Sequence, residues 1–527
     1  MSRILVGASC LLAAVALWAA LPLLLSITID TWLRWKYPLP SSQGGTPLPR
    51  ARYTWPNGQG TEKFFNGRSA AREWRRHWGP MYQIWTGWTP EMYIHLTHGY
   101  PIYNVLNWLT HAANSVITTP SHAKQFFRTS HHHIKAANNN SGWLFGEVLG
   151  VCVGLLSGKD WKRVRAHVEE HFSHPSATTY TADFVALARG YLRTTFLAGA
   201  EQSSSVKGGV IVEPAKALQF FPFFGVAQTL FGPLSPEQKR QLEGLAPVRE
   251  ELFKEVIRGG INRLSIAPLL SSRGARLLEE FQGQWERFVG DAYEKAVGID
   301  LASPPLVAGL WAAYKSGGIT KRECLQTLDE SLYANLDVTT HAISWNILLL
   351  AQHEWAQTEL RKEVLAAREN HLSQPYEKYI DREDTFLAAC VLESSRLKPI
   401  LPFSNPEAAP EDQYIDDYLI PRNTNVIVDS QAINIDNPFW INGKTYNPKR
   451  FAGLKKSDIR YNLWRFGFGP RQCLGKHVGE RLLRAITAEI IRRYVISVPG
   501  GEKVEMGKLQ SESWVGLSTA RIECVLV

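Results

Sequence analysis

Apolar residues recur at helical spacing along most of the chain. Between residues 322 and 368 there is neither proline nor glycine, and leucines and isoleucines recur every three or four positions. This pattern predicts one or two long helices. Similar spacing predicts further helices over residues 382–398 and 477–495. We therefore expect a mainly α-helical fold.

Strand-like segments are fewer. Residues 81–85 and 92–94 contain Tyr, Ile and Trp and flank Gly87 and Pro90, which predicts a hairpin. Residues 426–428, with the sequence Val-Ile-Val, form a third candidate strand. Beyond residue 60 there is no repeat, no low-complexity stretch and no obvious linker. We expect one body over residues 61–527, mainly α with a minor β-sheet region.

The N-terminal region contains the apolar stretch Ile4–Ile29, which carries no charged residue. A helix of this length can cross the ~30 Å hydrocarbon core of a bilayer. A cleaved secretory signal would have a shorter apolar stretch, and a buried terminal helix would more often show a polar face. We expect one transmembrane anchor over residues 1–30 and a Pro- and Gly-rich linker over residues 31–60. Arg34 and Lys36 then favour a cytoplasmic location for the rest of the chain.

Composition narrows the possible classes of protein. Of the 527 residues, 45% are hydrophobic and 20% are charged, as in globular proteins. The six cysteines include no CxxC pair, which argues against a disulfide scaffold and a cysteine metal knuckle. The 58 basic and 49 acidic residues give a net charge of +9 without a dense basic stripe, so we expect no nucleic-acid partner. The consecutive residues His131–His133 cannot converge on one ion in regular structure, and we expect a surface loop there.

The most informative segment is the glycine-rich loop Phe466–Gly475, in which Cys473 lies just before an amphipathic helix. Its glycines permit tight turns and close approach of a flat ligand. A cysteine at a helix start meets exposed amides and the positive end of the helix dipole, which favour a thiolate. Phe466 can shield the sulfur, and Arg471 can pair with a carboxylate. A dry thiolate beside a flat anionic ligand suggests an iron porphyrin, whereas the alternative is an inert buried cysteine.

The same ten residues also resemble a known motif. The pattern Phe-x-x-Gly-x-Arg-x-Cys-x-Gly resembles the haem-binding loop of the cytochrome P450 family. The resemblance implies a P450-like fold and a haem cofactor whose iron is ligated by Cys473. It also implies that Phe466, Arg471 and Gly475 belong to the cofactor-binding loop.

Three further segments resemble motifs of this family in the same chain order. Glu393 and Arg396 match its Glu-x-x-Arg helix motif, and their spacing places both charges on one helix face. Arg450 matches the arginine of its Pro-x-Arg-Phe segment, which implies a buried network with that pair. Trp161 and Arg165 match its Trp-x-x-x-Arg motif, which implies that both side chains reach a haem propionate.

The chain departs from the family's oxygen-binding helix motif. The acid of that motif is present as Asp337, but Asn335 stands where glycine is usual and Val338 where threonine is usual. In the family that threonine helps to deliver protons to bound dioxygen. We take Asp337, Thr339 and Asn335 as candidate catalytic residues. Either water and Asp337 carry the protons, or proton delivery is altered and the chemistry shifts toward substrate-assisted reactions, radical coupling or peroxide rearrangement.

The resemblance spans about residues 37–527 and implies a monooxygenase that uses dioxygen. The chain shows no flavin or nicotinamide fingerprint, so we expect electrons from NADPH–cytochrome P450 reductase on the same membrane, that of the endoplasmic reticulum. Lys476, Arg481 and Arg484 follow the cysteine loop and can present a basic surface to an acidic reductase. The alternative is an ordinary solvated helix face.

The segments expected to line the substrate site are mostly apolar or aromatic, which suits a lipophilic small molecule. These segments are residues 138–150, 332–340, 399–404 and 513–518. The general pattern resembles fungal members of the family that tailor secondary metabolites. Oxidative coupling or desaturation at the same haem centre is an alternative. A non-catalytic haem-binding module and a membrane structural protein are the opposing classes.

Overall fold

The computed structural model describes most of the chain. The described residues are 19–35, 45, 47–55, 58–86, 113–135, 142–203, 206–298, 304–369, 375–501, 515 and 519–527. They fall into two compact units. Unit 1 comprises Met1–Gly146, Glu255–Ser272 and Pro402–Asp429, and unit 2 comprises Glu147–Lys254, Arg273–Leu401 and Ser430–Val527.

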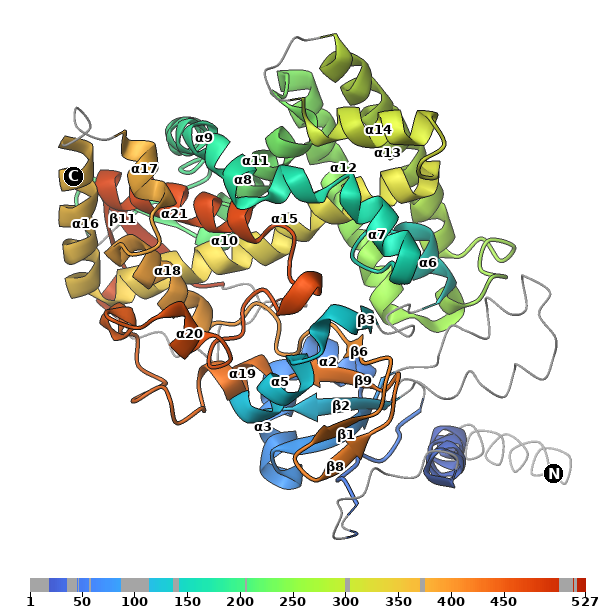
Figure 1. Ribbon diagram of the computed structural model, residues 1–527. Coiled ribbons are helices and arrows are strands. Elements are labelled where there is room, and N and C mark those ends of the chain that lie inside the picture. Colours follow the sequence, from blue (N-terminus) through green and yellow to red (C-terminus); the bar gives the residue numbers. More distant parts are fainter. Residues whose placement is uncertain are drawn as a thin grey trace, which may run out of the picture. The chain divides into compact units, whose positions relative to one another are not determined.

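Unit 1 is built around a five-stranded sheet in the order β1-β2-β9-β6-β3 (Figure 1). Strand β1 pairs antiparallel with β2, β2 pairs parallel with β9, and β6 pairs antiparallel with both β9 and β3. The strands are β1 (Met81–Trp85), β2 (Ala113–Ile117), β3 (Ile134–Lys135), β6 (Glu407–Ala408) and β9 (Asn425–Val428). The predicted strands at residues 81–85 and 426–428 are therefore confirmed. The expected partner at residues 92–94 lies outside the described residues, and β1 pairs with β2.

Unit 1 also contains three helices after the N-terminal one, and a hairpin. They are α2 (Gly60–Phe65), α3 (Gly67–Trp78), α5 (Pro120–Phe127) and the hairpin β7 (Gln413–Ile415) with β8 (Tyr418–Ile420). The core forms where α3 packs on the sheet, and Trp74 of α3 stacks on Phe403 with ring centroids 5.9 Å apart. Thr119 caps α5 by accepting the amide hydrogen of His122. This cap gives a hydrogen-bond partner to a backbone amide that the first turn of the helix would otherwise leave unpaired, and so stabilises the helix.

The N-terminal helix occupies residues 19–35, and it packs through Leu33 against Tyr53 and Trp85. Asp30 accepts a hydrogen bond of 2.8 Å from the backbone N–H of Tyr53. Residues 1–18 of the predicted anchor lie outside the described residues. In the part of the chain that the structure describes, no helix combines enough length with enough apolar character to cross a membrane.

Unit 2 is mainly helical, and its longest helix is α15 (Lys321–Gln352). Thr320 and Glu323 form a capping box at its start, which satisfies backbone amides that the first turn leaves free. The apolar pattern of residues 322–368 resolves into α15 and α16 (Glu354–Glu369), separated at His353. The other two predicted helices are confirmed as α18 (Phe386–Leu397) and α21 (Lys476–Arg493).

Helix α15 (yellow in Figure 1) packs against α11 (Phe220–Phe231), α18 and α21. Unit 2 also holds a four-stranded sheet in the order β10-β11-β5-β4. Its strands are β4 (Glu201–Gln202), β5 (Val210–Val212), β10 (Tyr494–Ser497) and β11 (Ile522–Leu526). The mainly α fold with minor sheets predicted from the sequence is confirmed.

The remaining helices connect these elements. The α-helices are α6 (Trp143–Leu149), α7 (Gly158–Ala166), α8 (His174–Thr179), α9 (Thr181–Thr194), α10 (Pro214–Ala217), α12 (Pro236–Arg258), α13 (Arg273–Val297), α14 (Leu306–Lys315), α17 (Tyr376–Asp381), α19 (Ser430–Asn434) and α20 (Lys456–Ile459). Short 3-10 turns are η3 (Ser130–His132), η5 (Glu169–Phe172), η6 (Gly260–Arg263), η8 (Pro448–Phe451), η9 (Gly469–Arg471) and η10 (Pro499–Gly501). Among them, α7 and η9 carry candidate site residues.

Candidate active site

The cysteine loop folds back on itself before α21 begins. Gly467 and Gly469 have φ angles of 81° and 71°, in the left-handed region that glycine enters without strain. The backbone N–H of Cys473 donates a hydrogen bond of 2.7 Å to the carbonyl oxygen of Phe466. Gly475 is the N-cap of α21, so Cys473 lies just before the positive end of an 18-residue helix. That end stabilises an anionic ligand such as a thiolate.

Cys473 differs from the other cysteines that the structure describes, because it is exposed and they are buried. Burial raises the pKa of the Cys324 and Cys524 thiols to about 12. It also raises the pKa values of Cys152 and Cys390. A thiol that stays protonated in an apolar interior is a poor ligand. Among the described cysteines, Cys473 is therefore the one suited to hold a metal.

The loop arginine meets the predicted Trp-x-x-x-Arg pair. The guanidinium carbon of Arg471 lies 4.6 Å from the centroid of the Trp161 ring, and that of Arg165 lies 5.7 Å from it. Arg471 also donates a hydrogen bond to the carbonyl oxygen of Leu156. Arg165 is further paired with the exposed Glu169 at 3.2 Å. Two cations around one tryptophan, next to the cysteine loop, fit the two carboxylates of a haem.

The sequence did not indicate how the rest of the loop is fastened. Arg465 forms an ion pair of 2.7 Å with Glu480 of α21, and its guanidinium lies 4.8 Å from the Phe466 ring. Phe468 packs edge-on against Trp464 with ring centroids 5.1 Å apart. In the sequence, the only sign of the ion pair with Glu480 was the positive charge of Arg465 directly before Phe466.

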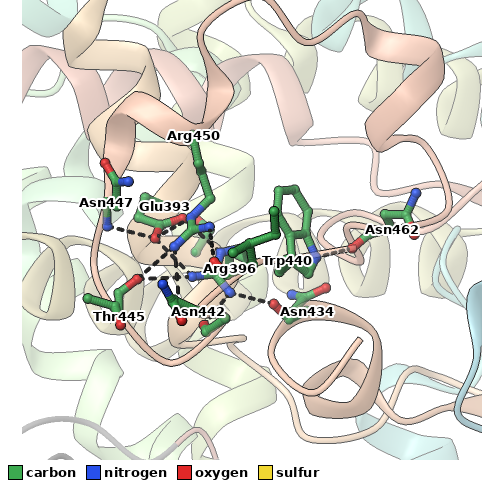
Figure 2. A network of polar contacts seen from close by, with 12 residues as sticks. Glu393, Arg396, Asn434, Trp440, Asn442, Thr445, Asn447, Arg450 and Asn462 are labelled. Carbon is green, nitrogen blue, oxygen red and sulfur yellow. Dashed lines mark hydrogen bonds and ion pairs between the residues drawn. The ribbon is translucent and has the colours of Figure 1, made fainter. Parts of the chain in front are cut away.

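The predicted network of Glu393, Arg396 and Arg450 is present, with Glu393 and Arg396 buried and Arg450 partly exposed (Figure 2). Arg396 donates two hydrogen bonds of 2.8 Å to the Glu393 carboxylate, and Arg450 donates one of 2.9 Å. Arg396 also donates to the carbonyl oxygens of Asn434 and Gly443. Each charge is thus paired and hydrogen-bonded, as burial of charge requires.

Trp440 joins this network, although no sequence motif indicated it. The guanidinium of Arg396 lies 5.3 Å from the Trp440 ring centroid, and the indole N–H donates 2.7 Å to the carbonyl oxygen of Asn462 (Figure 2). The tryptophan therefore covers Arg396 while bonding to the chain ahead of the cysteine loop. This contact links the network to the segment that leads into Phe466.

In the middle of α15, Asn335 and Thr339 are hydrogen-bonded to each other. The Thr339 hydroxyl donates a bond of 2.7 Å to Oδ1 of Asn335, and Nδ2 of Asn335 donates one of 2.7 Å to the Ser331 carbonyl oxygen. A carbonyl oxygen can only accept, so the orientation of the amide is fixed. Thr339 is only 6% exposed, whereas Asp337 and Val338 are half-buried. The hydroxyl of Thr339 is thus held by Asn335.

One predicted surface is wrong. Arg481 and Arg484 are only 1% and 3% exposed, so they cannot form a basic surface for a reductase. Arg481 donates a hydrogen bond of 2.6 Å to Asp381, and Arg484 donates one of 2.6 Å to the Arg382 carbonyl oxygen. The helical pattern showed their spacing but not the elements packed over them. Lys476 remains partly exposed.

The expectation for the consecutive histidines of unit 1 is decided by burial. His131 and His132 are exposed as predicted, but His133 is buried, with its Nδ1 3.4 Å from the Glu407 carboxylate. Lys135 lies 3.6 Å from the same carboxylate. Within the described residues, no cluster of histidine, cysteine and acidic side chains has the geometry to hold a metal ion. The predicted lining segments 138–150 and 513–518 lie partly outside the described residues.

Comparisons with known proteins identify the family of the chain. The family model of cytochrome P450 matches residues 79–522. The chain is 66% identical to cytochrome P450 monooxygenase gliC of Aspergillus fumigatus, over 97% of this chain and 96% of that protein. It is 44% identical to cytochrome P450 monooxygenase verC of Clonostachys rogersoniana, over 90% and 88%. It is 35% identical to cytochrome P450 monooxygenase asaD of Aspergillus flavus, over 97% and 92%. The chain therefore belongs to the cytochrome P450 family and is a monooxygenase with a cysteine-ligated haem.

Proposed function

We propose that this protein is a membrane-bound monooxygenase that oxidises a lipophilic secondary metabolite with dioxygen and electrons from NADPH–cytochrome P450 reductase. The observation that carries the proposal is the exposed Cys473 at the head of α21, close in sequence to the arginine that packs on Trp161. Membership of the family implies that the enzyme uses dioxygen, a small-molecule substrate and a redox partner. The proposal goes beyond the family in naming the class of substrate and the reductase.

In this proposal Cys473 is the iron ligand, while Arg471, Trp161 and Arg165 hold the haem carboxylates. When bound, the haem supplies the oxidising chemistry, which a thiolate ligand favours by donating electron density. Phe466 and Gly475 belong to the loop, and the Phe466 ring would shield the sulfur from water when the haem is bound. Arg471 donates a hydrogen bond to the Leu156 carbonyl oxygen, and this bond orients its guanidinium.

Proton delivery is assigned to Asp337, Asn335 and Thr339. Val338 has no hydroxyl, and the Thr339 hydroxyl already donates to Asn335. Thr339 therefore offers its lone pairs, and Asn335 retains one N–H beyond the bond to Ser331. In this arrangement Asp337 is the one acid of the three, and water relays its protons.

The assignment of a secondary metabolite rests on the fungal relatives and on the apolar character of the lining segments. Hydroxylation is the expected outcome for a monooxygenase. Oxidative coupling or desaturation at the same centre is the second candidate, and the replacement of the usual threonine by Val338 favours it. The comparisons favour an enzyme over a non-catalytic haem-binding module.

Membrane attachment is supported by exposed apolar side chains in unit 1. On the helix at residues 19–35 these are Leu21, Leu23, Leu24 and Ile27, and in the segment after α12 they are Ile261, Leu264, Ile266, Leu269 and Leu270. Such side chains favour a lipid surface over water. The proposed location is the endoplasmic reticulum membrane, attached by one pass, with the catalytic domain facing the cytoplasm. Lys159 and Lys162 are exposed on α7 and offer positive charge to an acidic reductase.

Replacement of the proposed ligand tests the assignment directly. The reduced, carbon-monoxide-bound spectrum of the purified parent should show the band typical of a thiolate-ligated haem, and Cys473→Ala should lose both this band and turnover. Cys324→Ala is the matched control, because that thiol is buried in α15. A Cys473→Ala protein with unchanged spectrum and activity would contradict the proposal. Metabolite profiles of a host with and without the chain would then identify the substrate.

A further inference from the structure

The loop between α6 and α7 is held by side chains of α15. Three of its backbone amides donate to them: Val151 to Oε1 of Gln326 at 2.8 Å, Val153 to Oγ1 of Thr327 at 3.2 Å, and Gly154 to Oε2 of Glu330 at 2.9 Å. Irregular backbone must find such partners when it is buried. The three acceptors lie within two turns of one helix, so the loop follows the position of α15.

Gln326 holds both the loop and the last turn of α6. Besides accepting from Val151, it donates a hydrogen bond of 2.7 Å through Nε2 to the carbonyl oxygen of Glu147. The backbone N–H can only donate and the carbonyl can only accept, so both ends of the amide are fixed. The Gln326 side chain thus bridges the Glu147 carbonyl oxygen and the Val151 N–H.

Glu330 sits in a space that fits it closely. A Cβ atom on Gly154 would lie 1.8 Å from Oε1 of Glu330, so any other residue at position 154 displaces the carboxylate. Burial, together with the neighbouring Glu330 carboxylate, raises the pKa of the Cys152 thiol well above its ordinary value. The thiol therefore stays protonated beside Glu330.

The same loop leads into the cationic cluster described above. The Leu156 carbonyl oxygen accepts a hydrogen bond from Arg471, and the Ser157 carbonyl oxygen accepts one of 3.3 Å from the backbone N–H of Trp161. Arg163 of α7 donates hydrogen bonds of 3.0 and 2.6 Å to Glu323, at the start of α15. The loop and α7 are thus both fastened to α15, and Arg471 is fastened to the loop.

We propose that Glu330, with Gln326 and Thr327, is a positioning residue of the haem site: it fixes the loop that orients Arg471 and the start of α7 toward the cofactor carboxylates. The inference rests on the proposed function, because it assigns those arginines to the haem. The inference adds a specific cause for the orientation of these arginines. That cause is a set of side chains in α15, far from the cysteine loop in sequence. Outer partners of this kind change cofactor affinity without touching the cofactor.

The test compares Glu330→Ala and Glu330→Gln in the haem-loaded full chain. Two quantities are measured, the rate of haem transfer to apomyoglobin and the reduction potential of the iron. Glu330→Ala should lose haem about tenfold faster and shift the potential, as loss of an outer partner does. Glu330→Gln keeps an oxygen for the Gly154 amide and should restore both values toward those of the parent. Arg322→Ala is the matched control, since Arg322 is exposed near the start of α15 and pairs with Glu147 at 3.2 Å at the surface, and it should change neither.

The outcomes separate the two proposals. A Glu330→Ala protein that melts at a lower temperature but keeps the parent's haem-loss rate and potential would show a purely structural role and overturn the inference. If that variant yields no folded protein, Gly154→Ala displaces the same carboxylate by its Cβ and takes its place, with the same expected and contrary results. A parent protein without a thiolate-type spectrum would instead reject the proposed function.

Discussion

The Glu393–Arg396–Arg450 network and the middle of α15 lie in the same unit but handle polar groups differently. The side chains of Glu393 and Arg396 are fully buried, and charge meets charge with further bonds to backbone carbonyls. In α15, Asn335 is partly exposed and neutral, and its neighbour Val338 departs from the family motif. Removing one partner of a buried pair leaves an uncompensated charge and is costly, whereas an accessible neutral site can vary. The first region is therefore scaffold, and the second is the region to which we assign proton delivery.

Breaking the network should have the largest effect. Glu393→Ala leaves the Arg396 guanidinium buried without its carboxylate, and loss of one partner of a buried pair costs about 3–5 kcal/mol. Urea unfolding of the holoenzyme should show this loss in the free energy of unfolding. Lys449→Ala removes an exposed pair with Glu359 nearby and should change the free energy by less than about 1 kcal/mol. Equal effects of the two substitutions would mean that burial of the network does not matter.

Changing the middle of α15 should leave stability nearly intact and alter the reaction. Val338→Thr restores the family hydroxyl, and Asn335→Ala removes the acceptor of Thr339. Away from the core network, each should alter the free energy of unfolding by about 1 kcal/mol or less. Oxygen uptake, peroxide release and the ratio of products are measured per NADPH consumed. Unchanged values in Val338→Thr would show that Val338 does not shape proton delivery.

The smallest expected effect on the free energy of unfolding is at the start of α15, and it should vary gradually with pH. Burial alone raises the pKa of Glu323, but hydrogen bonds from Arg163 and Thr320 outweigh it, so the net pKa is lowered from its ordinary value of 4.5. A lowered carboxyl pKa contributes stability above that ordinary value, and this contribution is lost as the pH falls through the folded-state pKa.

Glu323→Gln removes this titration while keeping the shape of the side chain. The difference in unfolding free energy between parent and variant should be constant above pH 4.5 and should shrink in more acid solution. The measurement is urea unfolding at a series of pH values. A difference that does not vary with pH would show that the Glu323 charge plays no part in holding α7 to α15.

Much of the site was predictable because its residues form patterns that can be recognised within a few positions of the chain. The glycines around Cys473 mark a turn that other residues enter only with strain, and they precede a recognisable helix start. Glu393 and Arg396 lie one helical turn apart, so their pairing follows from spacing. Trp440 and Glu330 were not predictable, because a tryptophan in a loop and a glutamate on a helix carry no distinctive local pattern.

The sequence by itself determined the helices, the cysteine loop and the family, since periodicity, glycine and cysteine act within a few residues of chain. Only the tertiary structure decided that Arg481 and Arg484 are buried, that β1 pairs with β2, and that the Thr339 hydroxyl points to Asn335. Burial and the choice of hydrogen-bond partner depend on elements far away along the chain. The free energy of a charge or a hydroxyl is set by what packs around it, and local sequence does not specify those neighbours.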